Sequence, residues 1–231
     1  MADTADFEFA ALNEARNYRA ALLHDFKDYL RGNVLEVGAG IGQITAGLMA
    51  TPEINRVTSI EPDPEFCAQF RARFPEQDLV QGTVSDLRSD IPWNAVLSVN
   101  VLEHIETDSE ELDAYRRLLQ PAKGALCLFV PARPEIYAPI DKDFGHFRRY
   151  TRSELRAKLE AAGFSVAQLH YYNFVGYFAW WASFCLLKKR SFDVTQVRLF
   201  DRTIFPAVHG FESHIFRPPI GQSLMAVALA R

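Results

Sequence analysis

The sequence predicts an α/β fold in which helices cover both faces of a parallel β-sheet. Short apolar runs alternate along the chain with stretches of helical periodicity, which is the order that parallel sheets require. The run at 95–100 is apolar almost throughout, as is typical of a strand buried on both faces. At 231 residues, 48% of them hydrophobic, the chain is long enough for one such domain with a sizeable core.

The predicted elements begin with an amphipathic helix over 7–31, in which large apolar residues recur every four positions at Tyr18, Leu22, Phe26 and Leu30. Seven strands are expected at 34–37, 56–60, 78–84 (with its exit loop), 95–100, 125–130, 164–170 and 223–229. A stripe of Phe66, Phe70 and Phe74 predicts a helix that packs on the core after the second strand. A further helix is predicted after Thr151, which has the capping-box spacing to Glu154, and Gly163 suits its C-terminal end.

The loop after the first strand is the most informative feature for function. Three alternate glycines, Gly38, Gly40 and Gly42, end an apolar strand, and a helix start follows from Gln43. Glycine permits a sharp turn and the close approach of a ligand, and a helix N-terminus presents unpaired N–H groups. A dinucleotide-binding loop would have its third glycine at position 43. The observed Glu-x-Gly-x-Gly-x-Gly pattern instead resembles the first motif of class I S-adenosylmethionine (SAM)-dependent methyltransferases.

This resemblance extends over about residues 30–170 and resumes at the C-terminus. It includes the segment that follows the fourth strand, Val101 to Ile105, and the turn from Arg117 to Gly124 into the fifth strand. The resemblance implies a Rossmann-like, seven-stranded, mostly parallel sheet with helices on both faces and an antiparallel last strand. It also implies a single methyltransferase domain over 1–231, divided into a cap helix (1–31), a SAM-binding core (32–170), an aromatic insertion (171–221) and the last strand (222–231).

The implied cofactor is SAM, and the motifs assign its binding residues. Glu61 stands at the end of the second strand, where a carboxylate can accept hydrogen bonds from two ribose hydroxyls. Glu36 is placed by the resemblance near the methionine end of the cofactor. The family's acid at the adenine edge is missing, since Gly82 is followed by Thr83, and Asp86 is a candidate substitute. The full predicted set is Glu36, Gly38, Ala39, Gly40, Gly42, Glu61, Pro62, Thr83, Val84, Asn100, Val101 and His104.

The methyl acceptor is expected to meet the segment 141–150, which resembles a loop found in a subgroup of bacterial small-molecule methyltransferases. His146 is the candidate general base because an imidazole titrates near neutral pH. Arg148 and Arg149 are candidates for binding an acceptor carboxylate or phosphate, and Tyr150 follows them. The alternatives are structural: His146 is held by Asp141 or Asp143, and the arginines pair with nearby acids.

The insertion begins with a strongly aromatic run over 171–187 that basic residues follow. The run is too short to span a bilayer, which needs about 20 residues. It can form the wall of an acceptor pocket, for which Tyr177 and Trp181 are the candidates, or the contact of a homodimer; a membrane surface is the less favoured alternative because no polar face is evident. Residues 191–221 show little helical periodicity.

Composition narrows the function further. The formal net charge of −4 argues against a general nucleic-acid binder. Three scattered cysteines, no metal-ligand spacing and no basic-then-apolar leader predict a cytoplasmic protein without a bound metal. The sequence therefore predicts SAM-dependent methyl transfer to a hydroxyl, or second to an amine, of a small metabolite. The alternatives are a non-catalytic SAM-fold binding module, a membrane-associated enzyme acting on a lipid-like acceptor and, more distantly, an NAD-linked oxidoreductase.

Overall fold

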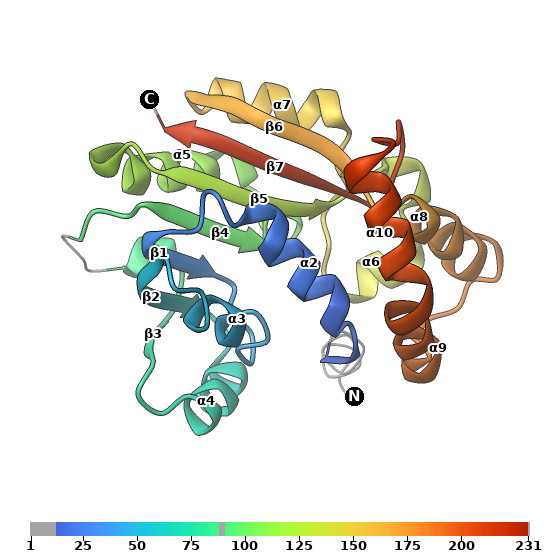
Figure 1. Cartoon of the computed structure of the whole chain (residues 1–231), viewed down its shortest axis with the longest axis horizontal. Helices are drawn as coiled ribbons and strands as arrows, with labels where there is room; N and C mark the ends of the chain where they lie inside the picture. The colour runs from blue at the N-terminus through green and yellow to red at the C-terminus, as the bar shows by residue number, and fades with distance from the viewer. Residues whose placement is uncertain (1–12, 88–90, 231) are drawn as a thin grey trace.

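The computed structural model describes residues 13–87 and 91–230, and they form one seven-stranded sheet with helices on both faces (Figure 1). The strand order across the sheet is β3-β2-β1-β4-β5-β7-β6. The strands are β1 (Gly32–Val37), β2 (Ile54–Glu61), β3 (Asp78–Gln81), β4 (Ala95–Val99), β5 (Ala125–Pro131), β6 (Phe164–Tyr172) and β7 (Ser223–Ala230). All seven predicted strands are present, and the predicted fold class is confirmed.

The one reversed strand is β7, which pairs antiparallel with β5 on one side and β6 on the other. The pairings of β1 with β2 and β4, of β2 with β3 and of β4 with β5 are parallel. The reversal is confirmed as predicted. Because the carboxyl ends of β1, β2, β4 and β5 share one edge of the sheet, the loops that follow them are brought together there.

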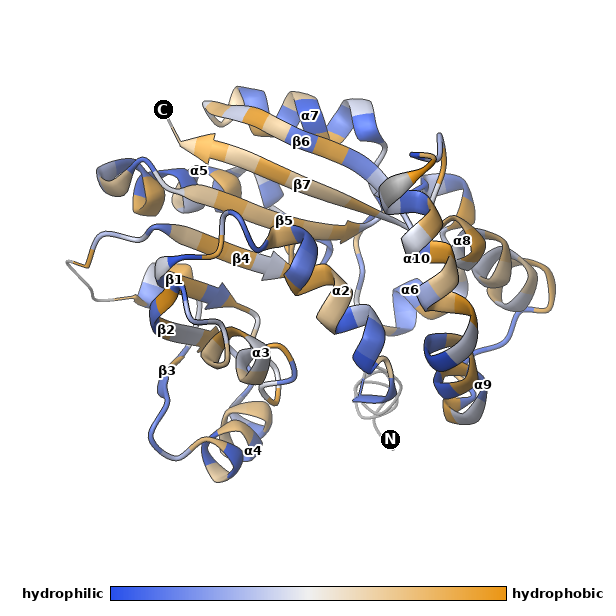
Figure 2. Ribbon diagram, viewed as in Figure 1, coloured by the Kyte–Doolittle hydropathy of each residue, from blue (hydrophilic) through white to orange (hydrophobic). Residues whose placement is uncertain are grey.

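Helices on the two faces of the sheet enclose two separate cores. The described helices are α2 (Arg16–Phe26), α3 (Thr45–Met49), α4 (Pro64–Arg73), α5 (Asp108–Leu119), α6 (Pro139–Asp143), α7 (Arg152–Ala161), α8 (Phe174–Trp180), α9 (Val194–Leu199) and α10 (Phe205–His214). On one face, α5 and α7 bury Leu112 and Leu155 against the sheet. On the other, α2 buries Leu22 and Phe26. Figure 2 shows the matching pattern, with β5 and β7 hydrophobic along most of their length.

The N-terminal helix predicted over 7–31 is interrupted at Ala15, and its main described part, α2, runs from Arg16 to Phe26. Residues 7–12 lie outside the described residues. The start of α2 is fixed by a distant side chain, because the Asp201 carboxylate accepts hydrogen bonds from the backbone N–H groups of Asn17 and Tyr18 at 3.0 and 2.9 Å. Such a cap from elsewhere in the chain leaves no local sequence signal.

The predicted boundaries of α7 are close to those observed. The Thr151 side chain accepts a hydrogen bond from the Glu154 N–H at 3.2 Å, as the capping-box spacing predicts. Gly163 ends the helix with a φ of +86°, a conformation that glycine adopts without strain. The turn then leads directly into β6.

The insertion is helical over most of its length, although residues 191–221 show little helical periodicity in the sequence. α9 and α10 are joined by a π-helical turn at Phe200–Ile204, and α8 continues into another at Trp181–Leu186. A π turn shifts the phase of the helix, so apolar residues on one side of the turn fall out of register with those on the other. Among the described residues, no helix combines the length and hydropathy that crossing a membrane would require. Figure 1 shows α6, α8, α9 and α10 grouped at the side of the molecule toward which β4 and β5 point.

Candidate active site

The glycine loop leaves β1 in a conformation that side chains rarely adopt. The φ angles of Gly38, Gly40 and Gly42 are +73°, +55° and +82°. The N–H groups of Gly38 and Ala39 donate to the Ile60 carbonyl at 2.9 and 3.0 Å, which folds the loop over the end of β2. A Cβ at Gly38 would lie 2.3 Å from a methyl group of Val101. The absence of a side chain therefore lets the loop after β1 and the segment after β4 approach each other.

Glu61 joins the loop to the end of β2. One carboxylate oxygen accepts the Gly40 N–H at 2.7 Å, and the other accepts the Asp63 N–H at 3.0 Å. The side chain is 6% exposed, and burial raises its pKa, while the two backbone hydrogen bonds oppose that rise. Each oxygen retains a second lone pair for a hydroxyl donor. The carboxylate is thus fixed at the carboxyl end of β2, and its contact with the ribose of SAM stays a prediction.

Glu36 lies deeper, on β1, and is 3% exposed. One of its oxygens accepts hydrogen bonds from the hydroxyls of Thr45 and Ser59 at 2.7 and 2.8 Å. Burial raises the pKa of Glu36 to about 7, and the two hydroxyl bonds only partly oppose the rise. These contacts tie β1 to β2 and to α3, so Glu36 supports the glycine loop from beneath. Its contact with the methionine end of SAM stays a prediction.

The loop after β3 carries the predicted adenine-side residues. Val84 is buried, whereas Thr83 and, beside Glu61, Pro62 are exposed. The Asp86 carboxylate accepts from the Thr83 N–H and hydroxyl at 2.9 and 3.0 Å. Asp86 thus closes a short turn in this loop. Its substitution for the family's adenine-reading acid stays a prediction.

The segment after β4 forms the other side of the loop region. Asn100 adopts a φ of +52°, and its N–H donates to the Phe129 carbonyl at 2.9 Å. This turn directs Val101 at Gly38 and leads into a single 3-10 turn, Leu102–His104. The predicted cofactor residues on β1, β2 and β4 therefore converge at one edge of the sheet, with His104 at the end of the segment.

His146 lies against this segment and is held by a buried ionic network. Its Nδ1 is 3.0 Å from Asp141, whose same oxygen accepts from Arg149 Nε at 2.8 Å. Asp141 is fully buried, and its other oxygen accepts the Ala138 N–H. Because the carboxylate can only accept, the His146 proton belongs on Nδ1 and Nε2 is left as the acceptor. Nε2 is buried and has no hydrogen-bond partner in the described structure.

The predicted acceptor-binding residues of the 141–150 segment are paired within the fold. Arg148 lies 2.8 Å from Asp108 and donates to the Glu106 carbonyl at 2.8 Å. Tyr150 is fully buried and donates to Asp108 at 2.9 Å. Arg149 lies with its guanidinium 4.3 Å from the centre of the Trp180 ring. These contacts dock the segment onto the start of α5, and acceptor binding by Arg148, Arg149 and Tyr150 stays a prediction.

The two tryptophans of the insertion have opposite surroundings. Trp180 is 6% exposed, donates from Nε1 to the Ile136 carbonyl at 3.1 Å and packs with Ile140 and Phe184. Trp181 is 46% exposed, and Tyr177 is partly buried beside the same cluster. The sequence assigns Tyr177 and Trp181 to the wall of an acceptor pocket, and that assignment stays a prediction. Which of the two neighbouring tryptophans is buried depends on the phase of the helix through the π turn at Trp181–Leu186, and the sequence pattern does not show that turn.

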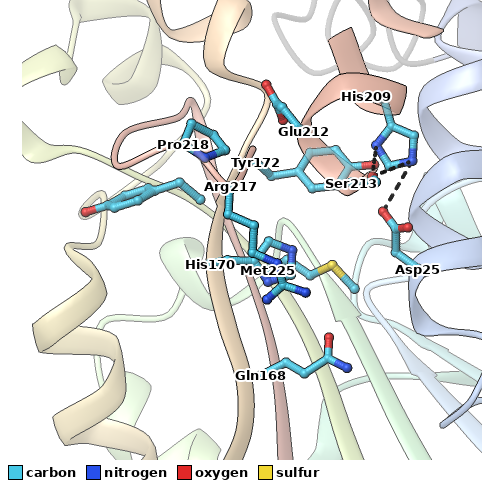
Figure 3. A pocket seen from close by; sticks show the side chains of 11 residues that line it. Asp25, Gln168, His170, Tyr172, His209, Glu212, Ser213, Arg217, Pro218 and Met225 are labelled. Atoms are coloured by element: carbon cyan, nitrogen blue, oxygen red, sulfur yellow. Dashed lines mark hydrogen bonds and ion pairs between the residues drawn. The ribbon is translucent and has the colours of Figure 1, made fainter. Parts of the chain in front are cut away.

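A pocket of about 160 Å³ lies elsewhere, between α2, β6 and α10 (Figure 3). Arg217, His170 and Met225 are among the residues that line it, and His209 of α10 lies 3.6 Å from Asp25 of α2. Burial, with Arg217 as the next cause, lowers the pKa of His170 to about 4. None of the predicted cofactor residues lines this pocket, so it is separate from the glycine-loop edge.

Comparison with known proteins gives the family. A model of a methyltransferase domain matches residues 10–169, which includes the glycine loop, Glu61 and the segment with His146. The chain belongs to the class I SAM-dependent methyltransferases. SAM is its cofactor. Contact of the individual residues at the sheet edge with SAM stays a prediction.

A relative in Mycolicibacterium smegmatis, named "Probable S-adenosylmethionine-dependent methyltransferase", is 31% identical over 137 residues. The match covers 58% of this chain and 52% of the relative, so the chain spans about half of that protein's length. A SAM-dependent methyltransferase of Archaeoglobus fulgidus has a TM-score of 0.57 at 16% identity, covering 93% of this chain and 94% of its own. A chain from the complex between the Haloferax volcanii Trm112 methyltransferase activator and "the putative methyltransferase" has a TM-score of 0.60 at 17% identity, and the match covers 96% of each chain. These structures support the fold.

Proposed function

We propose that this methyltransferase transfers the methyl group of SAM to a hydroxyl of a small metabolite, with an amine as the second choice. The observation that carries the proposal is the Asp141–His146 pair, which in the neutral ring leaves Nε2 as a hydrogen-bond acceptor beside the segment after β4. A hydroxyl must lose a proton as it is methylated, and a fixed imidazole nitrogen can accept that proton.

The residues divide the reaction between binding and proton removal. SAM, when bound, supplies a methyl carbon that leaves its sulfur with the bonding electrons staying on sulfur. Glu61 and the glycine loop hold the cofactor, and Val101 brings the segment after β4 against Gly38. His146 Nε2 accepts the hydroxyl proton while the oxygen bonds to the methyl carbon. Asp141 keeps the His146 ring oriented and stabilises the imidazolium that results.

The test is methyl transfer from labelled SAM to a panel of phenols, catechols, aliphatic alcohols and amines. His146→Ala should retain SAM affinity and lower turnover by about 10²–10⁴-fold at neutral pH. The loss should shrink at high pH, where hydroxide or an ionised acceptor replaces the base. Turnover by His146→Ala equal to that of the wild type would remove the base assignment, and no transfer to any acceptor would favour the non-catalytic binding module.

A lipid-like acceptor is the second candidate, and one observation favours it. Phe178, Trp181 and Leu186 are exposed on the insertion, and the cations Lys188 and Lys189 follow them. Exposed aromatics beside cations are what an interfacial contact uses. Flotation with anionic vesicles separates the candidates: wild-type flotation that Trp181→Ser loses would favour the lipid-like acceptor. A homodimer through the same residues would instead show as a concentration-dependent mass in sedimentation.

A further inference from the structure

Two segments far apart in sequence bring three metal-binding side chains together. Glu103 and His104 belong to the 3-10 turn after β4, and His146 follows α6. One ligand atom of each, a carboxylate oxygen and two imidazole nitrogens, lies within 4.8 Å of the others. The His104 and His146 rings meet edge to face with centroids 4.6 Å apart. The segments are tied at this point, since the Phe147 N–H donates to the Glu103 carbonyl at 2.8 Å.

The state of His146 supplies an independent indication. The residue is 8% exposed, and its Nε2 is a buried acceptor without a hydrogen-bond partner in the described structure. Leaving such a nitrogen unpaired costs free energy, which a bound cation would recover. Its other nitrogen faces the Asp141 carboxylate, which Arg149 fixes in turn. Metal-binding histidines have this arrangement, in which a carboxylate orients the ring and increases the basicity of the coordinating nitrogen.

We infer that Glu103, His104 and His146 bind one divalent transition-metal ion. Two imidazole nitrogens and one carboxylate suit Zn²⁺ and its neighbours, whereas Mg²⁺ and Ca²⁺ prefer oxygen ligands alone. Three protein ligands leave a coordination position open. Binding requires the ligand atoms to close to about 3–3.5 Å, the separation set by metal–ligand bonds of about 2.0–2.2 Å. The sequence spacing predicted no metal, because His146 is distant along the chain and only the fold brings it to the pair.

The cation would keep the proposed methyl transfer but change how the acceptor loses its proton, and its role in turnover rests on the proposed function. With the ion bound, His146 Nε2 coordinates the metal and no longer accepts the proton. An acceptor hydroxyl at the open position has its pKa lowered, as a zinc-bound water has. Its proton passes to solvent water, its oxygen bonds to the methyl carbon, and the electrons of the broken carbon–sulfur bond stay on sulfur.

The experiment titrates Zn²⁺ into the chelator-treated, tag-free full chain by calorimetry, with Mg²⁺ as the comparison ion. The wild type should bind one Zn²⁺ per chain, at least 100-fold more tightly than Mg²⁺. His104→Ala and Glu103→Gln should each weaken Zn²⁺ binding by more than about 10–100-fold, which is the typical loss when only a residue that orients a ligand is removed. His170→Ala is the matched control, because His170 also has a buried ring nitrogen without a partner yet lies outside the cluster; its affinity should match the wild type.

A second measurement covers variants that fold poorly. Co²⁺ added to the wild type should give visible d–d absorption that Zn²⁺ displaces, and His104→Gln should remove it. The inference is overturned if the wild type binds no Zn²⁺, or if His104→Ala and His104→Gln, with circular dichroism like that of the wild type, bind it as tightly. SAM titration and methyl transfer on the same metal-free preparation report separately on the proposed function: SAM binding and turnover without Zn²⁺ binding would remove only the metal.

Discussion

The cofactor edge is formed by the glycine loop at 38–42, Glu61 and the segment after β4. Its surface is shaped mainly by the main chain, whereas the surface of the insertion at 171–221 is shaped mainly by side chains. At the cofactor edge the main chain itself is shaped for function, by glycines at positive φ and by N–H groups that orient Glu61. In the insertion, side-chain packing determines which residues are buried, as the buried Trp180 and the exposed Trp181 show. Main-chain geometry leaves a local pattern in the sequence, whereas packing depends on distant partners. This difference explains why the predicted cofactor is confirmed, whereas the predicted acceptor stays a prediction.

The largest effect is expected from a substitution at a glycine of the cofactor edge. Gly38→Ala places a Cβ at a φ of +73° and 2.3 Å from Val101, so the loop or the segment after β4 must move. We expect SAM affinity to fall by at least about 100-fold, measured by calorimetry, with part of the loss arising from backbone strain. Gly210→Ala in α10 is the control, because its Cβ would meet no atom within 4 Å. It should leave SAM affinity unchanged; equal losses in both variants would contradict the distinction between the regions.

Within the insertion, substitutions of the two neighbouring tryptophans should differ in their effect on the free energy of unfolding. Trp180→Ala removes a buried ring and its hydrogen bond to the Ile136 carbonyl, and should lower the free energy of unfolding by about 3–5 kcal/mol. Trp181→Ala, at an exposed position, should change it by no more than about 0.5 kcal/mol. Chemical denaturation of both variants gives these values. A large loss for Trp181→Ala would show that this side chain is covered in solution, as a dimer contact would require.

A smaller effect is expected under the glycine loop. Burial raises the pKa of Glu36 to about 7 from 4.5, so the folded chain retains this proton between those pH values while the unfolded chain releases it. The stability that Glu36 contributes is therefore full below about pH 4.5 and declines as the pH rises through 7. Glu36→Gln keeps an acceptor for Thr45 and Ser59 but does not titrate.

Unfolding by urea at pH 5 to 8 measures this effect. The stability of Glu36→Gln relative to the wild type should rise with pH by on the order of 2 kcal/mol across that range. Glu76→Gln, at an exposed loop position, should show no such trend. If the stability difference between Glu36→Gln and the wild type does not depend on pH, the pKa of the Glu36 carboxyl group is not raised by burial.

Much of the fold followed from short-range patterns. The apolar strands, the cap at Thr151 and the glycine at 163 were predictable because each depends on neighbours along the chain. The start of α2 was not, because Asp201 provides its cap. In the insertion, π-helical turns hid the periodicity of α9 and α10.

The candidate site divides in the same way. The turn at the glycines and the place of Glu61 beside it could be predicted from one motif and one strand end. His146 was singled out by residue type, and its pairing with Asp141 was one of the alternatives considered. Two further contacts depend on the packing of two loops against each other. Arg149 donates to the same Asp141 carboxylate, and Glu103 lies beside the imidazoles of His104 and His146. No spacing within either loop encodes that contact.

The central claim is that the edge formed by the glycine loop and Glu61 binds SAM. Calorimetric titration of SAM and, separately, NAD into the wild type, Glu61→Ala and Glu65→Ala tests it most directly, since Glu65 is an exposed carboxylate nearby on α4. The wild type and Glu65→Ala should bind one SAM per chain and no NAD. Glu61→Ala should bind SAM about 30–1000-fold more weakly, because two hydrogen bonds from ribose hydroxyls to a carboxylate are lost. Binding of NAD in place of SAM, or unchanged SAM affinity in Glu61→Ala, would contradict the account.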